Sequence, residues 1–394
     1  MSNLINRIRS IDAFRAVTMF LMIFVNDLDG VPNTPLWLKH AAVNADGLGL
    51  ADTIFPAFLF IVGLAIPYAF EHRLKKDDAK IPMRIITRSF ALVFIGFFHA
   101  NMETYDEVHA ILPRPVWDSL ATFSFFFIFI DYSKSTSLLK RYLCQGFGIA
   151  LLIGVCAIYK SSDPGHSWLH LTWWGILGLI GWAYLVCAFI YYYSNGVLWV
   201  QAAAWLFFMF FNIDVHFGFL NFLAPVQKYV WLSGNGAMQA FTMAGIFVSV
   251  LYIRLTQNGE IKMLWVAMLL MAVILFNLGF IVRYFSGGIS KARDTPSWVL
   301  ICIGISLVIY ALFVFVVDTC GKYNWFKVIE PAGTNTFTCY LLPYLFYPMY
   351  QMSTLNYPQY FDQGTGGLIR SLLFALFIVW LSGLLQKINV RLKI

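Results

Sequence analysis

The sequence predicts an all-α fold: a bundle of helices integral to a membrane. Of the 394 residues, 60% are hydrophobic and only 12% are charged, whereas a soluble domain has roughly 25% charged residues. The hydrophobic residues recur in block after block, separated by short polar turns. Such blocks are typical of membrane-spanning helices, and they lack the alternation of apolar and polar residues that a transmembrane barrel requires.

About twelve transmembrane helices are expected, within a range of ten to twelve, in one domain over residues 1–394. The predicted spans are 11–27, 53–70, 84–101, 116–131, 142–159, 171–193, 197–212, 236–253, 263–282, 298–317, 333–350 and 367–386. The external gaps between them are rich in Pro, Gly, Asn and Asp, which favour loops. No gap is long enough for a separate soluble domain.

The basic residues predict the orientation. With the N-terminus inside, eighteen of the 27 Lys and Arg residues fall in cytoplasmic segments, eight are external, and Arg15 lies within the first span. This skew is the positive-inside pattern, so both termini are expected to be cytoplasmic in a multi-pass protein of the cell inner (plasma) membrane, surrounded by lipids. The net charge of +7 follows from this topology and requires no nucleic-acid partner.

The first span carries charges where a membrane helix rarely does. Only eleven uncharged residues separate Arg15 from Asp27, and a hydrocarbon core requires about 20 residues. The helix must therefore begin near Ile8 and take Asp12 and Arg15 into the cytoplasmic half. Their i,i+3 spacing places them on one helix face. They are either functional groups that face the bundle interior or an ion pair at the interface.

His40 is the most informative candidate for chemistry. It lies in the external gap after the first span, with Asn26 before it and Asn44 and Asp52 after it. Asp52 also opens the second span, where its carboxylate can cap the helix. A histidine held by a carboxylate and close to an amide suits proton abstraction from an amine or hydroxyl, with the amide holding a developing oxyanion. A solvated loop histidine is the alternative.

A family resemblance favours the chemical interpretation. The run from Arg7 through Asp12 and Arg15 to Asn26, then Leu38-Lys-His40-Ala-Ala, then Leu50-Ala-Asp52-Thr-Ile-Phe-Pro to Gly63 resembles heparan-α-glucosaminide N-acetyltransferase and its bacterial relatives. The opening Arg7-x-x-Ser10-x-Asp12-x-x-Arg15 also resembles the start of a wider group of membrane acyltransferases that acetylate surface glycans. Weaker matches follow at 174–184 and at 331–340, the latter containing Asn335.

The resemblance implies a transferase that moves acetyl from cytoplasmic acetyl-CoA, its co-substrate, to an amino sugar or a glycan hydroxyl outside. It assigns the catalytic roles to His40, Asn26 and Asp52, with His40 either a base or an acetyl relay. The inner mouth of a donor cavity is expected at Arg7, Asp12 and Arg15, with Asn335 contributing. Spans 116–131 and 142–159 depart from the family pattern as a probable inserted pair.

Other polar groups are weaker candidates. His166 and His170 stand at i,i+4 spacing, but no third ligand is evident, so no metal is expected. His99, Asn101 and Glu103 end the third span, and either line an acceptor site or form a wetted helix end. Lys291, Arg293 and Asp294 would meet an anionic glycan or lipid phosphates.

Two other functions compete with the transferase. A transporter or flippase for a glycan or lipid-linked sugar would use the same polar residues as cavity lining, although no internal repeat supports it. A membrane scaffold would use none of them. The sequence leaves open the acceptor, N- against O-acetylation, and whether the chain forms a homo-oligomer.

Overall fold

The computed structural model describes residues 8–74, 80–132, 137–227, 232–353, 355 and 357–394. These residues form helices and no named strand, which confirms the predicted fold class. The α-helices are α1 (Arg9–Asp29), α2 (Leu50–Leu74), α3 (Ile81–Glu103), α4 (Arg114–Phe129), α5 (Leu138–Ala157), α6 (Gly175–Tyr193), α7 (Leu198–His216), α8 (Ala224–Gln227), α9 (Ala237–Gln257), α10 (Ile261–Arg283), α11 (Pro296–Phe313), α12 (Glu330–Thr334), α13 (Thr336–Leu341), α14 (Pro343–Met352) and α15 (Gly364–Lys387). Short 3₁₀ segments lie between them: η1 (Leu36–Leu38), η2 (Asn221–Leu223), η3 (Ser233–Gly236), η5 (Asn324–Phe326) and η6 (Gln359–Phe361). The π-helix η4 (Val314–Thr319) continues α11.

All twelve predicted segments are helical in the described structure, and nine helices there are long and apolar enough to cross a membrane. These include α2, α3, α9, α11 and α15. Three predicted spans fall outside this set. Helix α1 is excluded because it contains Asp12, Arg15 and Asp27, and α4 because it has only 16 residues. The predicted span at 333–350 is excluded because it is divided into short helices. The polytopic membrane class is therefore confirmed, and the count of twelve stays a prediction.

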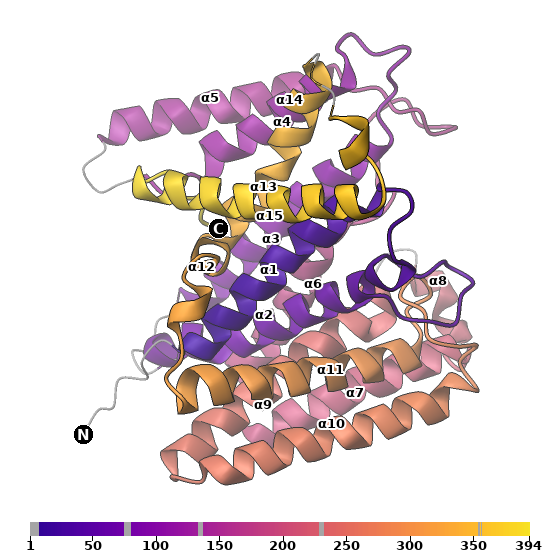
Figure 1. Cartoon of the computed structure of the whole chain (residues 1–394), viewed down its shortest axis with the longest axis vertical. Coiled ribbons are helices and arrows are strands. Elements are labelled where there is room, and N and C mark those ends of the chain that lie inside the picture. Colours follow the sequence, from indigo (N-terminus) through magenta and orange to yellow (C-terminus); the bar gives the residue numbers. More distant parts are fainter. Residues whose placement is uncertain (1–7, 75–79, 133–136, 228–231, 354, 356) are drawn as a thin grey trace.

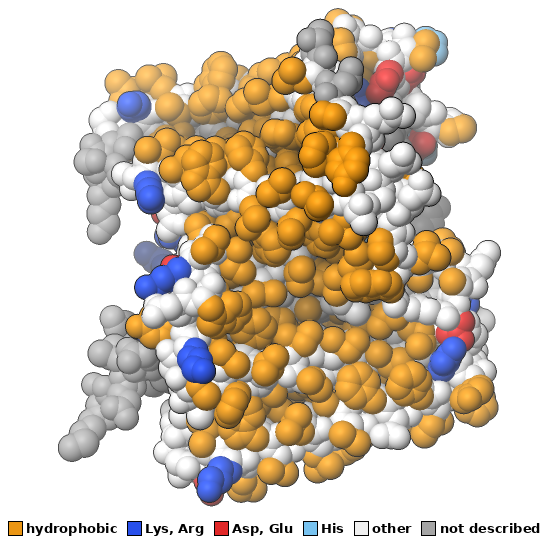
Figure 2. Space-filling model, viewed as in Figure 1, with side chains coloured by type: hydrophobic (Ala, Val, Ile, Leu, Met, Phe, Trp, Pro, Cys, Tyr) orange, Lys and Arg blue, Asp and Glu red, His pale blue; other side chains and the backbone are white. Residues whose placement is uncertain are grey.

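The helices lie side by side in three layers (Figure 1). Helices α7, α9, α10 and α11 form the lower layer of this view, α1, α2, α3 and α6 the middle one, and α4, α5 and α13–α15 the upper one. The start of α1 and the C-terminus lie on the same side of the bundle, as predicted. Lys and Arg side chains gather along this side, and hydrophobic side chains cover the broad face beside it (Figure 2).

The α4–α5 pair lies at the periphery. Helix α5 packs on α4, which in turn contacts α14 and α3. Only 17% of the most apolar stretch of α5 is buried within the protein, so most of the surface of this helix is available to lipid. A peripheral location is what an inserted pair requires, because the core helices then pack without it.

Helix α2 crosses α9 at very short range. A Cβ added to Gly63 would lie 2.0 Å from the carbonyl oxygen of Thr242, and one added to Gly245 would lie 2.0 Å from that of Phe60. Glycines at both helices therefore permit backbone contact, as small residues do in membrane helix pairs. This crossing fixes the middle of α2, the helix whose first turn contains Asp52, against α9.

Gly63→Ala should consequently destabilise the fold, because a backbone carbonyl cannot give way as a flexible side chain does. We expect a loss of about 2–3 kcal/mol, the usual effect of overpacking, measurable as a lower melting temperature of the purified protein in detergent. Gly154→Ala in α5 is the matched control, since nothing lies within 4 Å of its added Cβ. It should leave stability unchanged or raise it. Equal melting temperatures for Gly63→Ala and the wild type would contradict this account of the crossing.

The segment predicted as a span at 333–350 is three short helices instead of one. Asn335 interrupts it between α12 and α13 with φ −123° and ψ 41°, and Pro343 begins α14. The Asn335 amide donates to the carbonyl and hydroxyl oxygens of Ser382 on α15 at 3.3 and 3.1 Å, and its oxygen accepts from Thr338 at 2.7 Å. The break is therefore anchored by buried side-chain hydrogen bonds, and sequence periodicity did not reveal it.

Candidate active site

His40 and Asp52 form a hydrogen-bonded pair. His40 follows η1 in the loop between α1 and α2, and Asp52 lies in the first turn of α2. The distance from His40 Nδ1 to Asp52 Oδ1 is 2.6 Å. The Asp52 side chain is 3% exposed and that of His40 is 36% exposed. The predicted pairing of this carboxylate with this imidazole thus exists, with the ring at the surface and its partner beneath it.

The second carboxylate oxygen of Asp52 is held by the backbone. It accepts hydrogen bonds from the N–H groups of Ala41 at 2.9 Å and of Gly49 at 3.1 Å. Gly49 is required here, because a Cβ at this residue would lie 1.8 Å from the carbonyl oxygen of Lys39. Trp298 of α11 donates its indole N–H to the Asp52 carbonyl at 3.1 Å. The carboxylate is therefore fixed in orientation before any ligand binds.

This geometry determines what the imidazole can do. An ionised Asp52 is an acceptor only, so the proton of a neutral His40 ring must reside on Nδ1. The lone pair is then on Nε2, which points away from the Asp52 contact. A histidine held in this tautomer by a carboxylate can accept a proton from an amine or hydroxyl.

The loop between α10 and α11 fastens the histidine loop to the bundle. Asp46 accepts from the Ile289 N–H at 2.7 Å and from Arg283 Nε at 2.8 Å, and Ser290 donates to the Val43 carbonyl at 3.3 Å. The Ile289 hydrogen bond has the largest effect on the pKa of Asp46 and lowers it; burial opposes this, and the Arg283 guanidinium adds to the lowering, so the pKa is below its ordinary value. The Asp46–Arg283 ion pair and the hydrogen bond from the Ile289 N–H together attach the loop between α1 and α2 to the loop between α10 and α11.

The same loop brings a second charged pair towards Asp52. Burial lowers the pKa of Lys291, and the carboxylates of Asp52, Asp29 and Asp294 oppose that shift. Burial also raises the pKa of Asp294 to about 6, which Lys291 partly offsets. Lys291 and Asp294 are thus close enough to influence each other electrostatically, and Asp52 is close enough to influence Lys291. Their predicted contact with a glycan or lipid phosphates stays a prediction. Arg293 donates to the Gly287 carbonyl at 3.0 Å.

No hydrogen bond joins Asn26 to His40 among the residues that the structure describes. Asn26 is exposed in the last two turns of α1, and its amide has no hydrogen-bond partner within the described residues. It shares a helix face with Arg15, Met19 and Met22. The adjacent Asp27 faces elsewhere and accepts hydrogen bonds from Tyr347 and Ser371. The Asn26 amide is therefore free for a ligand, and its assigned catalytic role stays a prediction.

A cavity of about 390 Å³ lies below this face of α1. It begins beside the C-terminal tail and extends along α1 to Met22 and along α2 to Phe58. Met22 is four residues, or about 6 Å of helix, short of Asn26. His40 is not in the lining, so the cavity stops below the outer site. Four cations line it: Arg15, Arg88, Arg391 and Lys393.

The predicted donor-binding residues differ in their surroundings. Arg15 lines the cavity, with its guanidinium 3.3 Å from the Asp12 carboxylate and 3.4 Å from the Gly333 carbonyl. Asn335 also lines the cavity wall, although its amide is engaged by Ser382 and Thr338. Arg7 lies outside the described residues. Sequence reasoning missed Arg391 and Lys393; the only signal was a pair of basic residues at the end of the chain.

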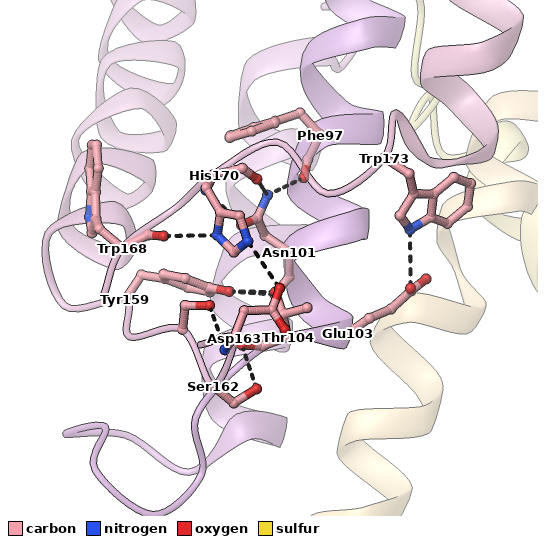
Figure 3. A network of polar contacts seen from close by, with 11 residues as sticks. Phe97, Asn101, Glu103, Thr104, Tyr159, Ser162, Asp163, Trp168, His170 and Trp173 are labelled. Carbon is pink, nitrogen blue, oxygen red and sulfur yellow. Dashed lines mark hydrogen bonds and ion pairs between the residues drawn. The ribbon is translucent and has the colours of Figure 1, made fainter. Parts of the chain in front are cut away.

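The third span and the loop after α5 form a separate polar network (Figure 3). Asn101 of α3 donates to the His170 carbonyl at 3.0 Å and accepts from its N–H at 3.2 Å, and Trp173 donates to Glu103 at 3.1 Å. His170 also contacts Asp163 at 3.0 Å. His166 stacks on His170 with a centroid distance of 4.1 Å. Throughout the described ranges, no three His, Cys, Asp or Glu residues are grouped to hold a metal. These contacts order an external loop.

The fold and the site together define a polytopic, all-α membrane protein with a histidine–carboxylate pair in the loop between α1 and α2 and a cation-lined cavity on the side of the termini. A family model described as "Domain of unknown function (DUF5009)" matches residues 7–221, and the chain belongs to this family.

Two curated relatives carry a name that describes an activity. Heparan-alpha-glucosaminide N-acetyltransferase of Mus musculus is 37% identical over 99 residues, which are 24% of this chain and 14% of the relative. The Homo sapiens protein of the same name is 39% identical over 98 residues, again 24% and 14%. The predicted resemblance to this group is confirmed. The match spans about one seventh of these relatives' length.

Proposed function

We propose that this protein is a transmembrane acyltransferase that moves an acetyl group from cytoplasmic acetyl-CoA to an amino sugar or a glycan hydroxyl on the external side of the membrane. The observation that carries the proposal is the His40–Asp52 pair, at 2.6 Å, on the opposite side of the bundle from a cavity lined by four cations. The resemblance to N-acetyltransferases supports the same reaction class.

The donor would enter the cavity from the cytoplasmic side. Arg15, Arg88, Arg391 and Lys393 offer charge for its phosphates, and guanidinium groups bind phosphate well because their N–H groups match its oxygens. The pantetheine arm is about 20 Å long, and the hydrocarbon core is about 30 Å thick. An arm that rises past Met22 would bring its thioester towards Asn26.

Transfer would then take place at the external end. His40 Nε2 accepts a proton from the acceptor amine or hydroxyl, whose nitrogen or oxygen forms a bond with the thioester carbonyl carbon. Asn26 donates to the oxygen that gains negative charge. The C–S bond breaks, and the thiolate of CoA leaves and takes up a proton. Asp52 keeps the imidazole in its reactive tautomer. An acetyl-histidine relay uses the same residues in two steps.

Binding of acetyl-CoA tests the proposal and separates it from a transporter or flippase of lipid-linked sugars, which has no reason to bind this donor. Purified protein should bind acetyl-CoA, and it should transfer the radiolabelled acetyl group to glucosamine or to a glycan hydroxyl. The proposal fails if acetyl-CoA at millimolar concentration neither binds nor loses its acetyl group.

Arg15→Gln should weaken acetyl-CoA binding by about tenfold, because it removes a partly buried cation from the cavity wall; a charge-assisted hydrogen bond contributes about 1.5–3 kcal/mol. The effect should decrease at high ionic strength. Titration calorimetry in detergent measures both. Lys387→Gln, in the last turn of α15 and outside the cavity lining, is the matched control and should leave binding within twofold of the wild type. Equal affinities for both variants would remove Arg15 from the donor site.

A further inference from the structure

His99 of α3 is a buried imidazole without a hydrogen-bond partner. Its residue is 5% exposed, and neither ring nitrogen has a partner in the part of the chain that the structure describes. A buried polar group left unpaired is unfavourable, and native structures contain few of them. The sequence suggested a wetted helix end or an acceptor-site residue here, but the ring lies inside the protein. A bound ligand that hydrogen-bonds the imidazole would explain why this unpaired group is buried.

The neighbours of His99 place it beside the donor cavity. The ring stacks on Tyr344 with a centroid distance of 3.9 Å and an interplanar angle of 15°, and its centroid is 6.1 Å from that of Tyr340. The two tyrosine hydroxyls are 3.2 Å apart. Tyr340 lines the cavity, as does Leu92, which lies two turns before His99 on α3. The rings of His99, Tyr344 and Tyr340 therefore lie together, and Tyr340 is the one that forms part of the cavity wall.

These rings lie on the route that the donor arm must take. Helix α3 runs from Ile81 to Glu103, away from the side of the termini, so the seven residues from Leu92 to His99 advance about 10 Å away from that side. The tyrosines belong to α13 and α14, on either side of the helix break before Pro343. The hydrogen bonds of Asn335 anchor the start of α13. Movement of the Tyr340 side chain, which lines the cavity, would therefore be what opens the cavity to the imidazole.

The chemistry of the free ring points to one class of ligand group. A neutral imidazole offers one N–H donor and one bare nitrogen acceptor. A secondary amide likewise offers one donor and one acceptor, and the pantetheine arm of CoA contains two such amides. The surrounding rings of Tyr340, Tyr344 and Phe125 exclude water, which strengthens such a hydrogen bond.

We propose that His99 is a donor-binding residue that hydrogen-bonds an amide of the pantetheine arm as the arm passes Tyr340 towards the external site. This inference rests on the proposed function and adds a second, outer contact region to the cation-lined mouth. His99 would hold the arm and take no part in the proton transfer at His40.

The test compares three variants of the full-length protein by titration calorimetry. His99→Phe keeps an aromatic ring against Tyr344 but removes both nitrogens, and should bind acetyl-CoA about fivefold to tenfold more weakly. His99→Gln returns a donor and an acceptor and should recover most of the affinity. His109→Phe, at an exposed external histidine, is the control and should match the wild type.

Two further measurements separate a binding role from a packing role. The probe 3′-phospho-ADP, the nucleotide portion of CoA without the arm, should bind wild type and His99→Phe equally. The ligand-free melting temperature of His99→Phe should equal that of the wild type or exceed it by about 2 °C, because an unpaired buried imidazole has been removed. A packing role predicts a lower melting temperature and no selective effect on the arm.

The outcomes distinguish this inference from the proposed function. If the wild type fails to bind acetyl-CoA, the proposed function is wrong and the inference falls with it. If the wild type binds acetyl-CoA and His99→Phe binds it within twofold, the proposed function stands and the role of His99 is overturned.

Discussion

Replacement of His40 by alanine is expected to lower the rate constant of acetyl transfer by about 10³-fold. Loss of a general acid–base group usually lowers a rate by about 10²-fold to 10⁴-fold. Binding of acetyl-CoA should stay within twofold of the wild type, because His40 is not part of the cavity lining. A relay mechanism predicts the same loss. Single-turnover transfer from radiolabelled acetyl-CoA to an amino sugar measures the rate, and calorimetry measures the binding.

A closely matched control is available on the same external side. His109 Nδ1 contacts Asp106 Oδ2 at 2.8 Å, and the other Asp106 oxygen accepts from the N–H groups of Val108 and His109 at 2.9 and 3.1 Å. This repeats the pattern of His40 and Asp52, but the His109 side chain is 73% exposed. His109→Ala should not change the transfer rate. Transfer at the wild-type rate by His40→Ala would reject His40 as base and as relay.

Replacement of Asp52 by asparagine should reduce transfer by on the order of 10²-fold or more through the tautomer of His40. The N–H groups of Ala41 and Gly49 both face one side-chain oxygen, so the amide oxygen of the variant must stay there. Its NH₂ group is then directed at His40 Nδ1 and forces that nitrogen to accept. The ring proton moves to Nε2, and the base is lost although the residue remains.

The same substitution should also destabilise the fold. Exchange of a buried carboxylate for an amide weakens its hydrogen bonds to Ala41 and Gly49, and we expect a loss of about 1–3 kcal/mol. Thermal melting in detergent measures this loss, and the transfer rate is measured at a temperature where the variant is folded. Asp106→Asn supplies the control for both readouts, with unchanged transfer expected. If Asp52→Asn transfers acetyl normally, Asp52 does not set the tautomer.

Much of the outer site follows from local sequence. Eleven residues separate His40 from Asp52 in the first turn of α2, and so short a connection keeps the two side chains within reach of each other. Each apolar block predicted as a span is helical in the described residues, whereas the short helix α8 was not predicted. The exact number of spans did not follow, because Asn335 breaks one segment through hydrogen bonds to Ser382, 47 positions away, and Pro343 begins a new helix. Periodicity carries no information about such distant contacts.

The sequence by itself determined that the chain is a helical membrane protein and that one histidine has a carboxylate close by, since hydrophobic length and short loops act locally. Only the tertiary structure decided which cations line the cavity, that Arg391 and Lys393 join Arg15 there, and that His99 is buried against Tyr344. These contacts bring together α1, α3, α14 and the C-terminal tail. Their partners are chosen by packing across the bundle, which no local pattern encodes.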